Sequence, residues 1–240
     1  MTYEIRTKIN EKDGAEMVWV PDGDFIMGSD DGRPDEKPRR AVFLSGYWIY
    51  KYPVTLEQYA KYCRESGFAL PPKPEWGYRH DHPVVNVSWH DALAYCEWAS
   101  VALPSEAEWE KAARGTDGRA YPWGSDWDAA RCVHSFGSIS SSTAPVTAHP
   151  SGASPFGAME MAGNVWEWCG DWYSNAYYNN APKRNPTGPP KGRARVLRGG
   201  GWGDGHPDAF RCATRYRAGL DPDFSIGGIG FRCVSRPDSS

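Results

Sequence analysis

The stretch Gly163-Asn164-Val165-Trp166-Glu167-Trp168 says most about the fold of this 240-residue chain. It joins a turn to an aromatic group that continues to Trp172. Inside this aromatic group, Glu167 can make an ion pair or cap backbone amides. Aromatic residues make up 14% of the chain, with 12 Trp and 13 Tyr, so the core can be built from rings that bridge irregular backbone.

Six further motifs surround this stretch in order. Before it come Met17-Val18-Trp19-Val20-Pro21 continuing to Phe25-Ile26-Met27-Gly28-Ser29, then Lys51-Tyr52-Pro53-Val54-Thr55, Pro83-Val84-Val85-Asn86-Val87-Ser88-Trp89 and Leu103-Pro104-Ser105-Glu106-Ala107-Glu108-Trp109-Glu110; after it come Arg198-Gly199-Gly200 and Ile229-Gly230-Phe231-Arg232. Taken in order, they resemble the formylglycine-generating-enzyme (sulfatase-modifying-factor) superfamily from about Met17 to Val234. The resemblance implies a single α+β domain of the C-type-lectin-like fold, with short helices and short antiparallel strands.

The resemblance also sets the expected domain limits and topology. We expect an N-terminal extension at 1–16, the domain at 17–235 and a tail at 236–240. Because the lectin-like fold brings the two ends of the domain together, Met17–Val20 and Ile229–Val234 are predicted to be adjacent strands of one sheet.

Local patterns predict the regular elements. Strands are expected at 17–20, 24–27 and 41–52, where β-forming residues flank turn signals. Helices are expected at 55–64, 90–99 and 106–114, with Thr55, Ser88 and Ser105 as their N-caps. From Thr116 onward no helix is predicted, and the 26 glycines and 20 prolines indicate many turns.

The composition limits the class of partner. The net charge of -3 gives no sign of a nucleic-acid partner or a basic membrane patch. No window is apolar enough for a membrane span, and residues 2–12 are too polar for a signal peptide, so a cytoplasmic location is expected. The six cysteines contain no CxxC pair and are expected to be buried free thiols, with one long-range disulfide left open: Cys63, Cys96, Cys132, Cys169, Cys212 and Cys233.

The family includes copper-dependent oxidases that convert a sulfatase cysteine to formylglycine, using two thiols five residues apart that bind Cu(I). In this chain the two cysteine positions fall on Asp204 and Ala209, and neither can supply a thiolate. Cys212, the one thiol inside that segment, is expected to be a packed core residue. Copper is therefore not expected. A mononuclear iron site, as in family members of sulfur–histidine biosynthesis, has no ligand set here.

The resemblance implies a structural calcium at the stretch quoted first. By position, the ligands would be the carboxylates of Glu160 and Glu167 and the backbone carbonyls of Gly163 and Val165. Oxygen ligands with two carboxylates suit this hard cation. The family's second calcium site is degraded here, since 131–142 lacks the expected Asn and Asp.

The segment between Arg198-Gly199-Gly200 and Ile229 is the predicted binding surface. It mixes aromatic and apolar side chains with Gly, Asp and Arg, without a helical or strand period. The candidate ligand-binding residues are Asp204, His206, Asp208, Tyr216, Arg217, Leu220, Asp221, Phe224 and Ile226. Asp204, His206 and Asp208 either converge on one ion or simply form a polar loop, and the loop is favoured. Trp202 and Phe210 are expected in the core.

These observations favour a ligand-binding protein that is non-catalytic or catalytically diverged, whose binding face is residues 202–228. Its partner would be a protein or another macromolecule. The resemblance includes the variable proteins of diversity-generating retroelements, which vary this same segment. The alternative is a formylglycine-generating oxidoreductase with lost or relocated copper ligands, and a third interpretation is an accessory domain that assembles with a partner protein.

Overall fold

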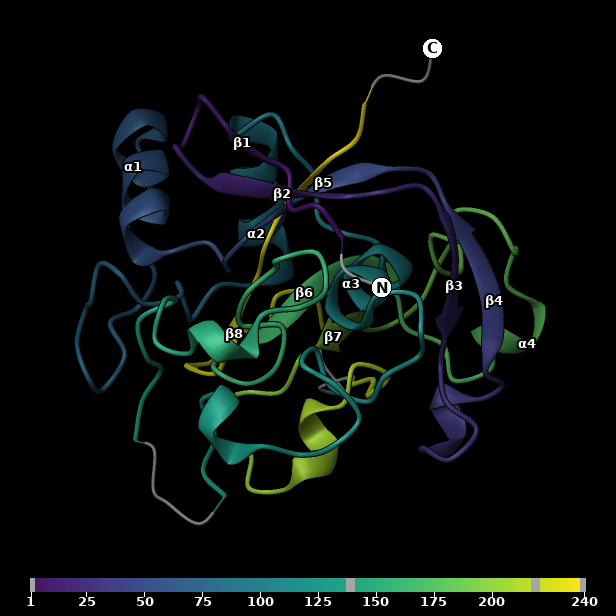
Figure 1. The fold of residues 1–240 in the computed structure, drawn as a ribbon. Helices are drawn as coiled ribbons and strands as arrows, with labels where there is room; N and C mark the ends of the chain where they lie inside the picture. Colours follow the sequence, from purple (N-terminus) through teal and green to yellow (C-terminus); the bar gives the residue numbers. More distant parts are fainter. Residues whose placement is uncertain (1–2, 137–140, 217–220, 238–240) are drawn as a thin grey trace.

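The computed structural model describes residues 3–136, 141–216 and 221–237. Its largest sheet has four antiparallel strands in the order β1-β2-β5-β9 (Figure 1). These are β1 (Thr7–Ile9), β2 (Glu16–Val20), β5 (Tyr47–Tyr50) and β9 (Val234–Ser235). The segment 1–16, expected to be an extension, thus contributes a strand to the sheet, with Lys8 paired to Met17.

The predicted contact between the two ends of the domain needs a correction. β2 and β9 lie in one sheet but are not adjacent, because β5 lies between them: Val18 pairs with Ile49, and Ile49 pairs with Val234. A strand can form backbone hydrogen bonds along both of its edges. β5 pairs with β2, from the first motif, along one edge and with β9, at the end of the domain, along the other. The start of the predicted C-terminal strand, β8 (Ile229–Gly230), belongs to a different sheet.

A two-stranded ribbon is formed by β3 (Gly23–Met27) and β4 (Arg40–Leu44). The sequence predicts one strand over 41–52, whereas the structure has two, β4 and β5, separated by Ser45 and Gly46. A side chain at Gly46 would overlap the Trp19 ring, at 2.5 Å, so the chain can turn tightly there only with glycine. The break sends β4 to the ribbon and β5 to the large sheet.

The third sheet contains the second half of the stretch Gly163–Trp168. β6 (Trp166–Trp172) lies between β7 (Arg195–Arg198), which is antiparallel to it, and β8, which is parallel. Figure 1 shows this sheet near the middle of the molecule, beside α3. The motifs that contain Arg198 and Gly230 therefore lie on either side of the motif that contains Glu167, because Glu167 pairs with Arg198 on one side and with Gly230 on the other.

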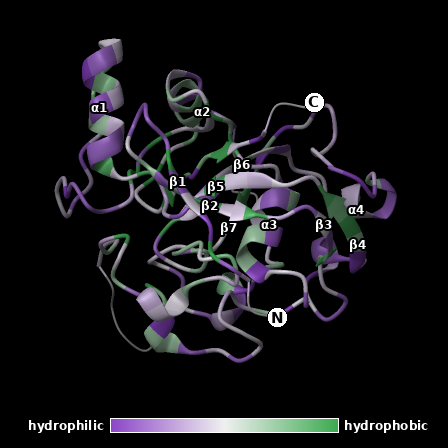
Figure 2. Cartoon of the chain, turned by 45° about the horizontal axis from the view of Figure 1, so that its top comes forward, coloured by the Kyte–Doolittle hydropathy of each residue, from purple (hydrophilic) through white to green (hydrophobic). Residues whose placement is uncertain are grey.

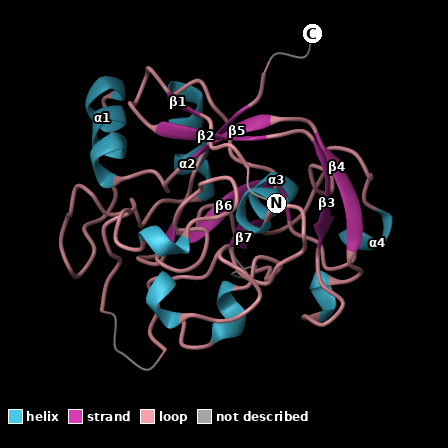
Figure 3. Ribbon diagram, viewed as in Figure 1, coloured by secondary structure: helices cyan, strands magenta, loops and turns pink. Residues whose placement is uncertain are grey.

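The three predicted helices are confirmed as α1 (Leu56–Ser66), α2 (Trp89–Trp98) and α3 (Glu106–Arg114). Thr55, Ser88 and Ser105 each cap a helix and form a reciprocal capping box. The second half holds one short helix that was not predicted, α4 (Tyr177–Asn180). Figure 3 shows that loops dominate, with single 3-10 turns at η1 (Pro34–Glu36), η2 (Ala129–Arg131), η3 (Pro150–Gly152) and η4 (Pro207–Phe210).

The described core falls into three hydrophobic clusters. One joins α1, α2 and the chain around Phe231, the second joins the β3–β4 ribbon to α3, and the third surrounds Phe210. In Figure 2 hydrophobic residues concentrate in the inner strands and helices. Along α1 and the outer loops, hydrophobic and hydrophilic residues alternate. All six cysteines are buried and free, and the Sγ atoms of Cys96 and Cys233 are 3.5 Å apart. Within the described residues, no helix has the length and hydropathy needed to cross a membrane.

Candidate functional site: the face of the C-terminal segment

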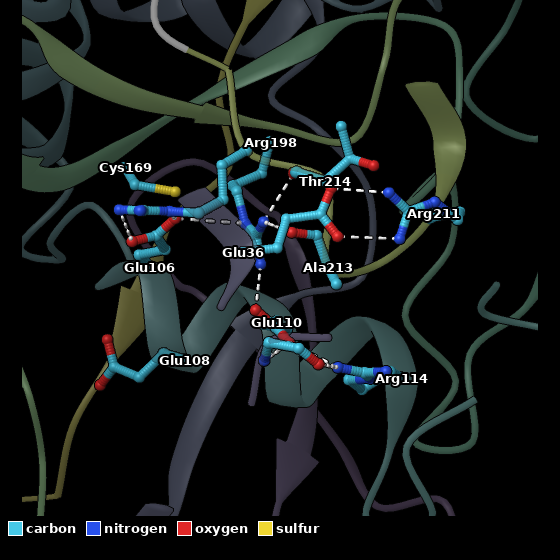
Figure 4. A network of polar contacts seen from close by, with 12 residues as sticks. Glu36, Glu106, Glu108, Glu110, Arg114, Cys169, Arg198, Arg211, Ala213 and Thr214 are labelled. Carbon is cyan, nitrogen blue, oxygen red and sulfur yellow. Dashed lines mark hydrogen bonds and ion pairs between the residues drawn. The ribbon is translucent and has the colours of Figure 1, made fainter. Parts of the chain in front are cut away.

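A buried network of charges holds the start of the C-terminal segment against α3 (Figure 4). Arg198, fully buried, forms ion pairs with Glu110 and, at 3.8 Å, with Glu106. Arg215 binds both oxygens of Glu106, at 2.7 and 2.9 Å. Bidentate pairs of this kind fix position as well as charge. Residues 198 and 215 are thereby clamped to one helix, and the chain between them is held as a closed loop.

A second buried ion pair links the stretch Gly163–Trp168 to the last motif, Ile229–Arg232. The carboxylate of Glu167 accepts hydrogen bonds from Arg232 at 2.6 and 2.7 Å and from Trp109 Nε1 at 2.8 Å. Of the two roles left open for Glu167, an ion pair inside the aromatic group is therefore present. Arg232 also donates to the backbone carbonyls of Met159 and Glu160. The turn that precedes β6 is thus fixed by the end of the domain.

Backbone hydrogen bonds attach residues 221–228 to the loop before α2 and to the first residue of that helix. Asn86 N donates to Ile226 O, and Trp89 N donates to Pro222 O. The indole of Trp202 donates to Gly227 O from the other side, at 2.9 Å. Residues 221–228 are therefore held in place by partners from distant parts of the chain.

Aromatic rings form the surface next to this segment. Tyr216 is 41% exposed and stacks on Trp166, with ring centroids 4.9 Å apart. Trp202 meets Trp76 edge to face, with centroids 5.3 Å apart. Ile226, also exposed, completes the group that we call the aromatic face: Trp76, Trp166, Trp202, Tyr216 and Ile226.

Beside Tyr216 lies a surface pocket of about 460 Å³. Its wall combines cationic, aromatic and amide groups: Arg33, Pro34, Asp35, Tyr173, Asn175, Arg215 and Tyr216. Tyr173 donates a hydrogen bond to Asp35 at 2.6 Å, and Arg215 lies 4.8 Å from the centre of the Tyr173 ring. Tyr216 is predicted from the sequence, whereas Trp76 and Tyr173 are not, because no local pattern connects them with residues more than forty positions away.

The predicted ligand-binding residues do not all face solvent. Tyr216, Asp221 and Ile226 are exposed, as predicted, whereas Phe224 is half-buried and packs on the core cluster of α1 and α2. Burying this ring removes apolar area from water, which explains why it turns inward. Arg217 and Leu220 lie outside the described residues. Phe210 is in the core, as expected, but Trp202 is only half-buried.

The acidic and histidine residues at 204–208 form a polar loop. Asp204 accepts hydrogen bonds from Trp166 Nε1 at 2.9 Å and from Gly201 N at 2.7 Å, so its carboxylate closes a turn under the aromatic face. His206 and Asp208 are exposed and contact each other at 3.5 Å. Among the described residues no group of three or more His, Cys, Asp or Glu side chains is arranged to hold a metal ion.

Comparison with known families identifies the scaffold. The model of the sulfatase-modifying factor enzyme 1-like domain matches residues 4–237. This chain belongs to that family. It is 34% identical to the formylglycine-generating enzyme of Thermomonospora curvata, over 98% of this chain and 98% of the relative. It is 38% identical to the serine/threonine-protein kinase Pkn1 of Chlamydia trachomatis, over 92% of this chain, and spans only 38% of that protein. A relative described as inactive, C-alpha-formylglycine-generating enzyme 2 of Mus musculus, is 31% identical over 96% of this chain.

Two solved structures share the fold of this chain. PvdO from Pseudomonas aeruginosa superposes with a TM-score of 0.84 at 28% identity, covering 95% of this chain and 97% of that one. Treponema denticola variable protein 1 superposes with a TM-score of 0.81 at 24% identity, covering 98% and 100%. The α+β, C-type-lectin-like architecture expected from the motifs is thereby confirmed.

Asp204 and Ala209, the two positions where the sequence leads us to expect the copper thiols of the family's oxidases, have structural roles here. Asp204 closes the turn described above, and Ala209 is buried in η4. Cys212 is fully buried, and burial raises the pKa of its thiol to about 12. A thiol that stays protonated at neutral pH is a poor ligand for Cu(I), which binds thiolate.

Proposed function

We propose that this protein is a ligand-binding member of the sulfatase-modifying factor family, and that the aromatic face of its C-terminal segment binds a protein or another macromolecule. The observation that carries the proposal is the exposed Tyr216 ring, which is stacked on Trp166 and therefore held in place before any ligand arrives. Tyr and Trp provide large contact areas at a small cost in side-chain entropy. Exposed rings that are already ordered are typical binding hot spots.

The backbone around the face supports the same proposal. Residues 221–228 are anchored to Asn86 and Trp89, and Arg198 and Arg215 clamp the other end of the segment on α3. A rigid scaffold with side chains presented from its loops is how variable receptors recognise ligands. Variable proteins of diversity-generating retroelements would be the corresponding functional class, with the surface of residues 202–228 as the part that recognises the partner.

The competing function is a formylglycine-generating oxidase that acts on a sulfatase cysteine. Its support is the 34% identity with the Thermomonospora curvata enzyme over nearly the whole chain. Against it stand Asp204 and Ala209 at the copper positions and the protonated, buried thiol of Cys212. Identity alone does not decide between the two, because a relative described as inactive is 31% identical.

A structural cation beside the aromatic face is part of the proposal. Glu160 suits such an ion, since its carboxylate is buried and neither oxygen has a hydrogen-bond partner among the described residues. Glu167 suits it less well, because Arg232 and Trp109 already occupy both of its oxygens. Glu160 with the carbonyls of Gly163 and Val165 would hold Ca²⁺, and the ion would neutralise a buried charge there.

Selection from a displayed random-peptide library tests the binding face even though the natural ligand is not identified. Peptides enriched on the wild-type protein are measured against Tyr216→Ala and Ile226→Asp. We expect affinity to fall by about 30-fold or more, as for a hot spot worth roughly 2 kcal/mol. Phe68→Ala is the matched control, because Phe68 is another exposed aromatic residue, 62% exposed, that packs on Tyr62 of α1 away from the face. Equal binding of the selected peptides to wild type and to both face variants would contradict the proposal.

A further inference from the structure

The strand β1 forms an open edge of the largest sheet. In the order β1-β2-β5-β9 it has β2 on one side, and no other described strand pairs with its second side. The opposite edge of the sheet is covered, because Val234 of β9 forms a bridge with Ala102. An unpaired strand edge is a template for pairing with another extended chain. Among the described residues, β1 is therefore the end of this sheet at which a further strand can form.

Backbone hydrogen bonds fix which way the groups of this edge point. Trp19 N donates to Arg6 O at 3.0 Å, and Asn10 N donates to Ala15 O at 2.9 Å. The bonded positions alternate along an antiparallel pair, so every second residue bonds to β2, and the residues between direct their N–H and C=O groups outward. The outward positions are Ile5, Thr7 and Ile9. We call residues 5–9 the edge segment.

The edge segment is fixed at both ends. Before it, the hydroxyls of Tyr3 and Thr116 share a hydrogen bond of 2.8 Å, and the Tyr3 ring packs on Phe156. After it, the side-chain amide of Asn10 donates to the Tyr50 hydroxyl at 2.8 Å. A strand that is already ordered loses little conformational entropy when a partner binds. The edge is thus presented in the conformation that strand pairing needs.

The two faces of the edge segment differ in chemistry, because successive side chains of a strand point to opposite faces. Ile5 and Ile9 lie on one face, on either side of Thr7, and are 58% and 57% exposed. Arg6 and Lys8 lie on the other face and are also exposed. A chain paired with this edge therefore meets apolar side chains on one face and positive charge on the other.

The two cations are held in place without a counter-charge. The Arg6 guanidinium is 5.4 Å from the centre of the Trp19 ring, and Lys8 Nζ is 5.0 Å from the centre of the Trp48 ring. Neither cation forms an ion pair with any of the residues that the structure describes. Contact with a ring leaves the N–H donors of both groups free to bind a carboxylate. This face therefore suits acidic side chains.

We propose that the edge segment binds an extended segment of a partner protein in which apolar and acidic residues alternate. The partner adds a fifth strand to the sheet through backbone hydrogen bonds with the outward positions. Its apolar side chains lie beside Ile5 and Ile9, and its carboxylates lie beside Arg6 and Lys8, since cross-strand neighbours are about 4.5–5.5 Å apart. The edge segment shares no residue with the aromatic face, so this proposal does not depend on the proposed function.

A second copy of this chain fits the edge less well. Two antiparallel edge segments bond through their outward positions, and the registers that pair most of the segment are centred on Arg6, Thr7 or Lys8. In these registers Arg6 lies opposite Arg6, Arg6 opposite Lys8, or Lys8 opposite Lys8 of the other copy. Like charges directly opposite each other are destabilising. The two cations therefore favour an acidic segment over self-pairing.

The test is fluorescence polarisation with two labelled peptides, one alternating valine with glutamate and the other alternating valine with lysine. The wild type should bind only the glutamate peptide, with an affinity that falls as salt rises. Thr7→Pro should weaken this binding about 10-fold or more, because it removes an outward N–H from the ladder. An edge strand accepts proline where the N–H faces solvent, so this variant should fold. Thr7→Val keeps the N–H and should bind like wild type.

Exchange of charge gives a second, independent variant. Arg6→Glu combined with Lys8→Glu should reverse the preference, so that the lysine peptide binds and the glutamate peptide does not. Tyr216→Ala should bind the glutamate peptide like wild type, which separates this surface from the aromatic face. Binding of neither peptide by the wild type, or equal binding of the glutamate peptide by wild type and Thr7→Pro, would overturn the proposal. So would a dimer in sedimentation that Thr7→Pro dissociates, because a second copy would then occupy the edge.

Discussion

Glu167 and Arg232, which lie 65 positions apart in the sequence, form a bidentate ion pair inside the core, with N–O distances of 2.6 and 2.7 Å. The pair joins the stretch Gly163–Trp168 to the last motif, Ile229–Arg232. It also fixes the turn before β6, because the same guanidinium donates to the carbonyls of Met159 and Glu160.

Glu167→Gln should destabilise the protein by about 3 kcal/mol or more, because Arg232 would remain buried without its counter-charge. The free energy of unfolding in urea measures the loss. The loss should persist in chelator-treated protein, since its cause is the guanidinium. Glu65→Gln removes an exposed partner of Lys12 and should leave stability unchanged. A cost below about 1 kcal/mol for Glu167→Gln would mean that the ion pair does not hold the turn.

Tyr216 and Phe224, two aromatic residues of the C-terminal segment, should respond differently to truncation. Phe224→Ala should lower the free energy of unfolding by about 2 kcal/mol, roughly half the cost of truncating a fully buried Phe. Tyr216→Ala should cost less than about 1 kcal/mol, the value of one stacked pair. Denaturant titration of both variants checks the order, and a larger loss for Tyr216→Ala would show that this ring belongs to the core.

Purified protein given Cu(I), oxygen and a cysteine peptide of the sulfatase type should form no formylglycine. Asp204 and Ala209 cannot hold a soft ion as two thiolates do. Mass spectrometry of the peptide detects the aldehyde, and the Thermomonospora curvata enzyme serves as the positive control. Aldehyde that depends on this protein would restore the oxidase as its function.

The contribution of Cys212 to stability should decline at alkaline pH. Burial raises its pKa from 9.0 to about 12, so the native thiol stays protonated where the unfolded thiol ionises. Its stabilisation is complete below pH 9 and is lost as pH rises from 9 toward 12. The cost of Cys212→Ala should therefore be smaller at pH 10 than at pH 7, by about 1 kcal/mol, measured by urea unfolding at both values. A cost that does not change with pH would show that the thiol already ionises in the native state.

Much of the local structure could be predicted from the sequence. Thr55, Ser88 and Ser105 mark the starts of three helices, because a capping box depends on residues only three positions apart. The single strand predicted over 41–52 was wrong for the opposite reason. The break at Gly46 is required by the ring of Trp19, which lies 27 positions earlier.

The sequence by itself determined the family, the capped helices and the segment that forms the candidate binding face. Tertiary structure alone decided that β5 lies between the two ends of the domain, that Tyr216 stacks on Trp166 and that Phe224 turns inward. It also decided that Glu167 pairs with Arg232 while Glu160 is left facing His149. The physical reason is range: caps and turns depend on neighbouring residues, whereas a ring stack or a buried ion pair depends on which distant segments the whole core brings together.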